Sequence, residues 1–189
     1  MTHAGVTVRE LELLELPTTR DPQRIAAALE MRFVAAIDRV RADWSRGVIT
    51  PLSLEPLHIA GCAGQEGGGL LYHRPADSTR PGADRDWELD PARPRRFDPS
   101  ALPQGLTQLA GHTGHRKCLA ELGDTWPTAR ARAHTTGGIR TLRAAGDGVT
   151  YDLGLVAAAT SPVAELILCD GEMRHVSPDE YGLVELVLK

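Results

Sequence analysis

Apolar residues near the start of the chain recur at helical spacing. Thr7 and Glu10 have the Ser/Thr-x-x-Glu spacing of a capping box, in which each side chain binds a backbone N–H of the first turn of a helix. Leu11, Leu13 and Leu14 follow directly. We therefore predict a short helix that begins after Thr7.

A second, longer helix is predicted to begin at Asp21-Pro22, because Asp is a favourable N-cap and proline is tolerated at the first helical position. The opposite face of this helix carries Arg24, Arg39 and Arg41, which we interpret as a solvated face rather than a binding surface. The apolar residues that follow at steps of three or four are expected to face the core as far as about residue 44: Ile25, Leu29, Phe33, Ile37, Val40 and Trp44.

The second half of the chain has the pattern of strands. Residues 106–110 form a short apolar run that predicts one strand. Residues 139–143 and 149–153 flank Gly146-Asp147-Gly148, and residues 165–169 and 172–176 flank Asp170-Gly171, so that two β-hairpins are expected. Residues 183–188 are a candidate last strand. The pattern predicts an α/β (α+β) chain with helices first and antiparallel hairpins last.

Residues 47–103 are rich in proline and should be mostly loop. Within them, residues 69–75 form a short apolar stretch that we interpret as a strand ending on His73 and Arg74. The Arg74 guanidinium is either a phosphate contact or a surface group near a proline turn. Residues 78–96 mix Arg and Asp with proline and are expected to be an exposed, mobile insertion.

Two histidines follow the strand at residues 106–110. Gly111 and Gly114 let the backbone turn tightly around His112, and His115 comes three positions later. A loop at the end of a strand is where α/β folds build sites, so this loop could bind a metal or a phosphate, or its imidazoles could simply be hydrated. Residues 116–122 can form a short helix with Cys118 in the core.

Composition narrows the class of protein. The 189 residues, 42% of them hydrophobic, suit a single domain. The net charge of −4 gives no basic footprint, so small molecules or proteins are expected partners rather than nucleic acid.

The cysteines and the apolar runs indicate the compartment. The three cysteines form no CxxC pair, which speaks against a disulfide framework or a zinc knuckle: Cys62, Cys118 and Cys169. No apolar run approaches the ~20 residues of a membrane span, and no signal-peptide pattern opens the chain, so we expect a cytoplasmic protein without membrane contact.

Two motifs, Thr2-His3-Ala4-Gly5 and Gly111-His112-Thr113, resemble in their order those of the calcineurin-like metallophosphoesterases. The subgroup they resemble most contains bacterial enzymes similar to diadenosine tetraphosphatases and protein phosphatases. The resemblance implies that His3 and His112 bind one metal of a dinuclear centre of Mn, Fe or Zn. It also implies that Arg74 contacts phosphate, and that His115 contacts phosphate or supports a ligand. The implied fold is the C-terminal half of a four-layer α/β/β/α sandwich.

The chain departs from that family in a way that bears on activity. The motifs Asp-x-His, Gly-Asp-x-x-Asp and Gly-Asn-His-Glu, which supply the other ligands and the catalytic histidine, do not occur in it. Hydrolysis of a phosphate ester in such a site needs two cations roughly 3.5–4 Å apart, held together by a bridging carboxylate. The resemblance therefore implies a phosphoesterase fragment that is inactive alone and needs a complementing N-terminal segment.

Two other functions remain open at this point. One is a non-enzymatic module that retains part of the fold for protein contact or self-association. The other is a single-metal protein that uses His3, His112 and His115. If the resemblance holds, the substrate is a phosphorylated small molecule or a phosphoprotein, His3 and His112 lie close together, and Arg74 is partly exposed. Asp98 and Asp170 are the carboxylates that could complete a metal site in this chain alone.

Overall fold

The first helix of the computed structural model, α1 (Val8–Leu13), begins at the expected capping box. The backbone N–H of Thr7 donates to the Glu10 carboxylate at 2.9 Å, and the Thr7 hydroxyl donates to the same oxygen at 2.5 Å. The prediction of this helix is therefore confirmed. The structure describes residues 3–61, 67–77, 95–111, 113–114, 118, 122, 138–146, 148–156, 162–170, 177, 179 and 184–185.

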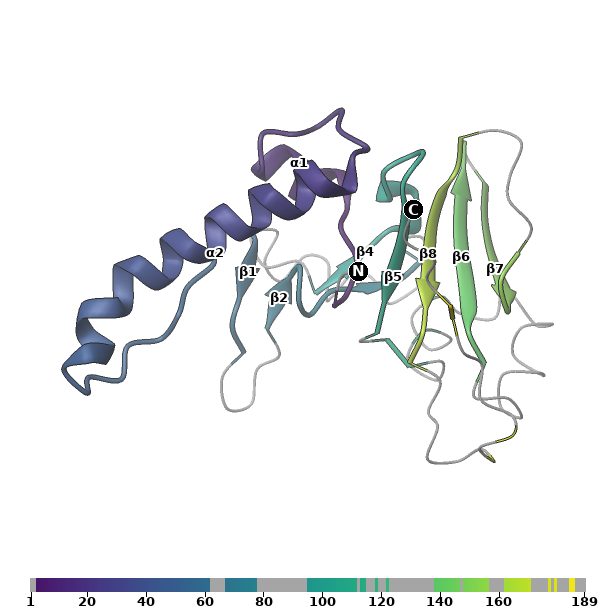
Figure 1. The fold of residues 1–189 in the computed structure, drawn as a ribbon. Coiled ribbons are helices and arrows are strands. Elements are labelled where there is room, and N and C mark those ends of the chain that lie inside the picture. Colours follow the sequence, from purple (N-terminus) through teal and green to yellow (C-terminus); the bar gives the residue numbers. More distant parts are fainter. Residues whose placement is uncertain are drawn as a thin grey trace.

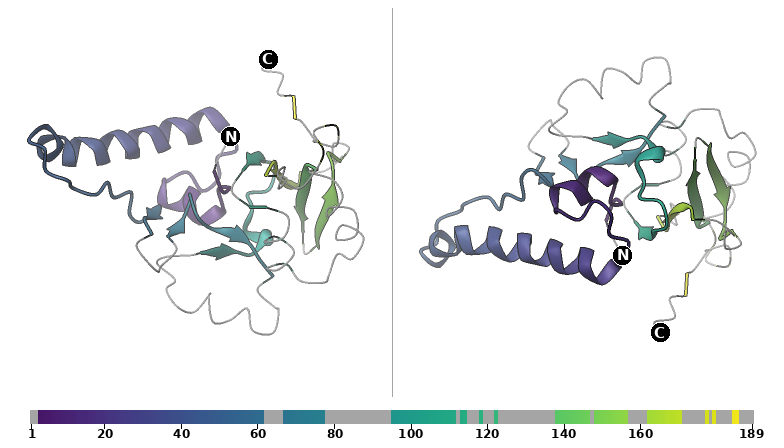
Figure 2. Two further views of the ribbon diagram at one scale, coloured as in Figure 1. Left: turned by 90° about the horizontal axis from the view of Figure 1, so that it is seen from below. Right: turned by 90° about the horizontal axis from the view of Figure 1, so that it is seen from above.

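The second helix, α2 (Pro22–Ser45), also begins and ends where the sequence predicts. Its N-cap Asp21 accepts hydrogen bonds from two backbone N–H groups of the first turn. The predicted inward face is only partly correct: Ile25 and Val40 are buried, but Phe33 is 42% and Trp44 44% exposed. The physical reason is that α2 extends well beyond the rest of the chain as an arm, so only one flank finds a partner (Figures 1 and 2).

A four-stranded sheet forms the other side of the molecule, in the order β5-β8-β6-β7 (Figure 1). The strands β6 (Arg140–Ala145) and β7 (Gly148–Leu153) form the expected antiparallel hairpin. The strand β5 (Thr107–Ala110) is parallel to β8 (Ala164–Leu168), which is in turn antiparallel to β6. The second predicted hairpin cannot be followed past β8, because residues 171–176 lie outside the described part, as does most of the predicted strand at residues 183–188.

Short strand pairs occupy the proline-rich middle of the chain. Antiparallel β1 (His58–Ile59) and β2 (Gly68–Gly69) form one pair, and parallel β3 (Arg74–Pro75) and β4 (Arg96–Phe97) form another. A 3₁₀ turn, η1 (Pro99–Ala101), follows. The single strand predicted at residues 69–75 is wrong. Gly69 has φ +77°, and a side chain there would meet the Leu57 carbonyl oxygen at 2.2 Å, so the backbone turns where a strand would continue.

The predicted insertion at residues 78–96 lies outside the described residues except at its end. There Arg96 belongs to β4 and pairs with Arg74 in β3. The last residue of this segment is therefore part of a strand rather than of an exposed loop.

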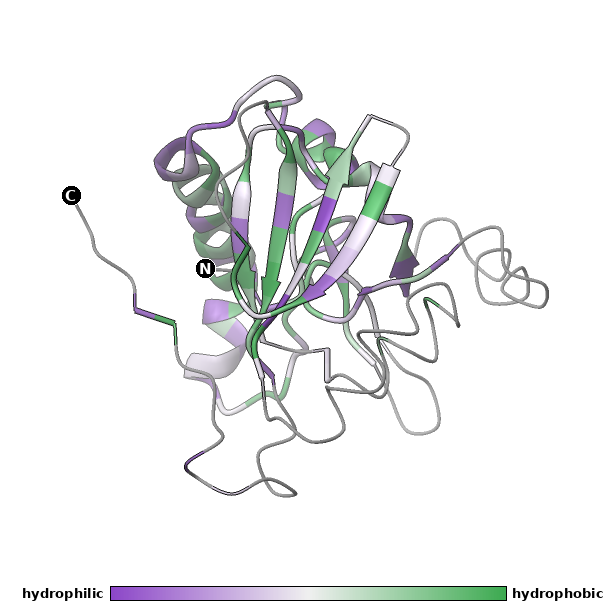
Figure 3. Cartoon of the chain, turned by 90° about the vertical axis from the view of Figure 1, so that its right-hand side faces the viewer, coloured by the Kyte–Doolittle hydropathy of each residue, from purple (hydrophilic) through white to green (hydrophobic). Residues whose placement is uncertain are grey.

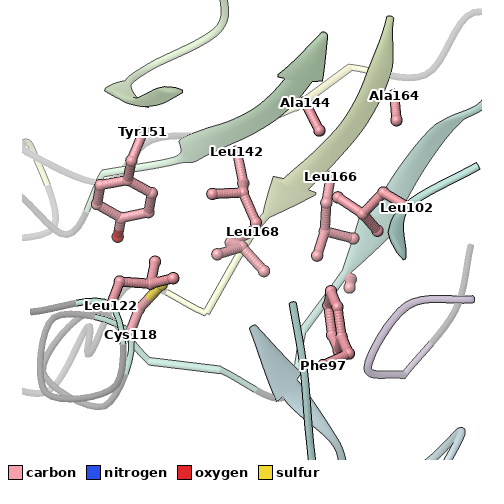
Figure 4. Close-up of a cluster of buried hydrophobic side chains, with 11 residues drawn as sticks. Phe97, Leu102, Cys118, Leu122, Leu142, Ala144, Tyr151, Ala164, Leu166 and Leu168 are labelled. Atoms are coloured by element: carbon pink, nitrogen blue, oxygen red, sulfur yellow. The ribbon is translucent and has the colours of Figure 1, made fainter. Parts of the chain in front are cut away.

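The core lies between the sheet and the segments packed on one of its faces (Figure 4). Cys118 is fully buried, as expected from sequence, and most of the predicted helix around it lies outside the described residues. Smaller clusters join α1 and α2 to this body through Leu106 and Leu57. The structure confirms a mixed α/β fold with small sheets and few helices. Within the described residues, no helix is long and apolar enough to span a membrane.

Successive side chains of each strand point alternately to the two faces of the sheet, whose hydropathy Figure 3 shows. One face of the sheet carries Leu142, Leu166 and Tyr151 in a cross-strand row. The other face carries a polar row in which Glu165 accepts hydrogen bonds from Thr107 and Arg143. This alternation is what a sheet with one buried face requires.

Candidate functional site

The segment that contains His3 lies alongside β5. The Gly111 backbone N–H donates to the His3 carbonyl at 3.2 Å. Three residue pairs further along, the side-chain amide of Gln108 accepts from the Val6 N–H and donates to the Val6 carbonyl, both at 2.7 Å. Gln108 is buried, so these bonds are shielded from water and fix the register of the two segments. His3 is thereby held beside the end of β5, with an exposed residue surface.

The loops that follow the two parallel strands meet at Arg140. Its Nη2 donates to the carbonyl of Thr113, after β5, at 3.2 Å, and to the carbonyl of Asp170, after β8. Arg140 is fully buried, although it opens β6 in line with Leu142 and Ala144 on the core face of the sheet. One guanidinium therefore joins both loops at the carboxyl ends of parallel strands, the edge where α/β sheets place sites.

The surroundings of Arg140 disfavour a nucleophile, because burial raises the pKa of the phenol and of the thiol near it. Among the described residues, Arg140 Nε and Nη1 and the Thr113 hydroxyl are buried without a hydrogen-bond partner. Burial raises the pKa of Tyr151, Cys118 adds to that rise, and Arg140 opposes it. Burial likewise raises the pKa of the Cys169 thiol against the opposing effect of Arg140. The phenol and this thiol therefore stay protonated at neutral pH.

Two buried histidines lie close to the His3 segment. The ring of His73 is 1% exposed, its Nε2 lies 2.9 Å from the Gly5 carbonyl, and the ring packs on Phe97 at a centroid distance of 4.8 Å. Burial lowers the pKa of His73, opposed by the Glu10 carboxylate. The neutral ring donates from Nε2 to the carbonyl, which leaves Nδ1 as a buried lone pair.

The other imidazole belongs to His58, which stacks on Tyr72 and donates from Nδ1 to the Gly68 carbonyl at 2.8 Å. Burial lowers the pKa of His58, the hydrogen bond to the Gly68 carbonyl opposes this shift, and electrostatic repulsion by His3 and His73 lowers the pKa further. The ring of His58 is therefore close enough to both other histidines to be affected by them.

Of the four site residues expected from the sequence, the structure describes His3 and Arg74. His3 lies beside Gly111, the residue before His112, but His112 and His115 are outside the described residues, so their distances to His3 are not defined. Arg74 is only 7% exposed, and both the expected partial exposure and the alternative of a surface group are wrong. Its backbone pairs with the segment that enters β4: the Arg74 N–H donates to the Arg95 carbonyl at 2.9 Å, and Arg74 is opposite Arg96 in the strand pair.

A metal site needs several donor side chains that converge on one point. Among those residues, no group of three or more His, Cys, Asp or Glu side chains is arranged to hold an ion. Asp98 caps η1, accepting from the Ser100 N–H at 2.9 Å and from its hydroxyl at 2.6 Å. Asp170 contributes its carbonyl to Arg140. The described donors alone do not assemble such a site, and the two candidate ligands His112 and His115 lie outside the described residues.

Arg140 and Gln108 were not identified from the sequence. A signal was present for Arg140: the hairpin pattern that places Leu142 inward also places Arg140 inward, two residues earlier. An inward cation on a strand needs a special partner. The role of Gln108 had no comparable signal, because its partner Val6 is 102 residues away.

Comparison with known proteins gives no further guide to this site. No family model, curated protein or solved structure matches the chain.

Proposed function

We propose that this chain forms part of a metal-dependent phosphoesterase of the calcineurin-like type and carries one side of its metal site. The observation that supports the proposal is the hydrogen bond from Gly111 N–H to the His3 carbonyl, which brings together two motifs far apart in the sequence. His3 and His112 are the proposed ligands, and neutral imidazoles suit Mn, Fe or Zn. The small sheets and helices would belong to one half of a four-layer sandwich.

In this proposal, Arg140 organises the loop that contains His112. It binds the carbonyl of Thr113, the residue directly after that histidine, and it ties this loop to Asp170. The proposed substrate is a phosphorylated small molecule or a phosphoprotein. Because the bridging aspartate and the asparagine motif are absent from these residues, we expect no hydrolysis by this chain alone.

Metal titration tests the proposal directly. The chain is titrated with Mn²⁺ or Zn²⁺ by calorimetry, alongside His3→Ala, His112→Ala and, as a control outside both motifs, His134→Ala. We expect weak binding that is lost in the first two variants and kept in the third. Equal binding by all four proteins, or none by any, contradicts the assignment of His3 and His112.

Hydrolysis of a generic phosphodiester and phosphomonoester in Mn²⁺ provides the second test. The expected result is background turnover by the chain alone and restored turnover when a segment with the aspartate and asparagine motifs is supplied. Turnover by the chain alone that His112→Ala abolishes would show a complete site within these residues.

A non-enzymatic interaction module is the alternative that a specific observation favours. The helix α2 leaves Phe33 42% and Trp44 44% exposed, and a group of exposed apolar side chains on one element can mark a protein-contact surface. Metal stoichiometry separates the alternatives: two ions favour an enzyme, one ion favours a single-metal protein with His3, His112 and His115, and none favours the module.

A further inference from the structure

An exposed apolar stripe runs along α2 beside its buried flank. Phe33, Ile37 and Trp44 follow one another at spacings of four and seven residues, and Ala26 lies seven residues before Phe33. Side chains at these spacings lie on one face of a helix. Phe33 and Trp44 are exposed and Ile37 is half-buried, so the stripe is open along most of the helix. Figure 2 shows α2 standing clear of the sheet.

We propose that this stripe binds a second copy of the chain through antiparallel pairing of the two α2 helices. Antiparallel pairing about a two-fold axis makes residues on either side of the axis face one another. If Phe33 of each copy faces Ile37 of the other, the same register places Ala26 opposite Trp44. A small residue then faces the largest one, which is the size match that a close helix pair needs.

The charges on the border of the stripe fit the same register. Glu30 and Arg41 flank the apolar residues, and antiparallel pairing places Glu30 of one copy beside Arg41 of the other, twice per dimer. Both residues are exposed. Arg41 is paired with Asp38 at 2.7 Å in its own helix, whereas Glu30 has no ion pair among the described residues. In a parallel pair, Glu30 and Arg41 would lie about three turns apart along the axis and could not meet across the interface, so this charge pair favours the antiparallel arrangement.

The area of the contact sets the expected strength. A helix of 24 residues is roughly 36 Å long. A single helix pair of that length falls short of the ~1,200 Å² typical of stable interfaces. We therefore expect a dissociation constant in the micromolar range or weaker. The dimer must then be measured over a range of protein concentrations.

Sedimentation equilibrium of the whole chain, from micromolar to near-millimolar concentration, tests the proposal. We expect a monomer–dimer equilibrium that Phe33→Glu weakens at least tenfold. Met31→Glu is the matched control, because Met31 is also apolar and 68% exposed but lies on another face of α2. A monomer throughout the range, or equal weakening by Met31→Glu, overturns the proposal. Far-ultraviolet circular dichroism checks that each variant keeps its helices.

A charge exchange tests the register itself. Glu30→Arg and Arg41→Glu should each weaken the dimer severalfold, because each places like charges together. The double variant restores opposite charges across the interface and should recover most of the affinity. Losses that simply add in the double variant would exclude the antiparallel register, even if the chain dimerises.

Discussion

Two fully buried charged side chains, Glu10 at the start of α1 and Arg140 at the start of β6, find their hydrogen-bond partners in different ways. Glu10 accepts hydrogen bonds from the Thr7 N–H, the Thr7 hydroxyl and the Arg9 guanidinium at 2.5–2.9 Å, all within three residues of it in sequence. Arg140 binds the carbonyls of Thr113 and Asp170, which are distant in sequence.

The difference shows which charge belongs to local structure and which to the tertiary arrangement. The Glu10 network forms as soon as one helical turn forms, so it fixes the start of α1 and little else. The Arg140 bonds form only when both loops after the parallel strands are in place. Substitution of Arg140 is therefore expected to disturb the candidate site, whereas substitution of Glu10 is expected to disturb only the start of α1.

The largest expected effect is that of Arg140→Ala. The variant leaves a cavity beneath the sheet and removes the donor from two loop carbonyls, and we expect a loss of roughly 2–5 kcal/mol in the free energy of unfolding. Urea unfolding measures it. The control Arg143→Ala breaks a half-buried pair with Glu165 and should cost about 1 kcal/mol or less. Equal losses would mean that Arg140 is no more than another strand residue.

Glu10→Ala should have the next largest effect. Without the carboxylate, the Thr7 N–H and hydroxyl lose their buried acceptor, at a cost of about 1–3 kcal/mol. Glu10→Gln keeps an acceptor in the capping box and should lose much less. Glu12→Ala, at an exposed position of α1, should be within about 0.5 kcal/mol of the parent. A Glu10→Gln loss as large as that of Glu10→Ala would show that the charge itself matters.

Local contacts explain what could be predicted from the sequence. The capping box, the Asp21-Pro22 start of α2 and the hairpin turn between β6 and β7 each depend on residues a few positions apart, and all three were predicted correctly. The parallel pairing of β5 with β8 was not predicted, because no local pattern encodes which distant strands become neighbours. The exposure of Phe33 was missed for a related reason: periodicity indicates an apolar face but not how much of it finds a partner.

The candidate site shows the same limit. The glycine-flanked loop around His112 was visible in the sequence, but the contact between the His3 motif and Gly111 was suggested only by the family resemblance. Burial of Arg74 depends on β4, which lies beyond a long proline-rich segment. Spacing alone could not reveal either contact.

A pH titration of stability extends the comparison to a buried group that is neutral. Burial lowers the folded-state pKa of His73 below the ordinary value of 6.5, so the folded protein resists protonation. Its contribution to stability is present above about pH 6.5 and is lost as pH falls from there toward the folded pKa. His58 shifts in the same direction. Each histidine can add at most about 1.4 kcal/mol per pH unit to the slope of the free energy of unfolding against pH.

Substitution separates the two histidines. His73→Gln keeps a donor for the Gly5 carbonyl but cannot be protonated, so the slope of stability between pH 7 and pH 5 should decrease. The double variant with His58→Gln should be flatter still. A parent protein with constant stability over this range would show that neither ring resists protonation in the folded state.

The smallest expected effect is that of Tyr151→Phe. It tests whether the Tyr151 hydroxyl and the Arg140 guanidinium stabilise the fold together or independently. The Tyr151 hydroxyl is near Arg140 and Cys118, and it points toward Cys118 and Leu122 in the core (Figure 4). Removing it should cost about 0.5–1.5 kcal/mol, because the phenol is buried and its hydrogen bonds disappear. The same substitution in an Arg140→Ala background should cost nearly nothing, since its main charged neighbour is then absent. An equal cost in both backgrounds would show that the hydroxyl and the guanidinium act independently, and that Arg140 is held in place by the carbonyls of Thr113 and Asp170 alone.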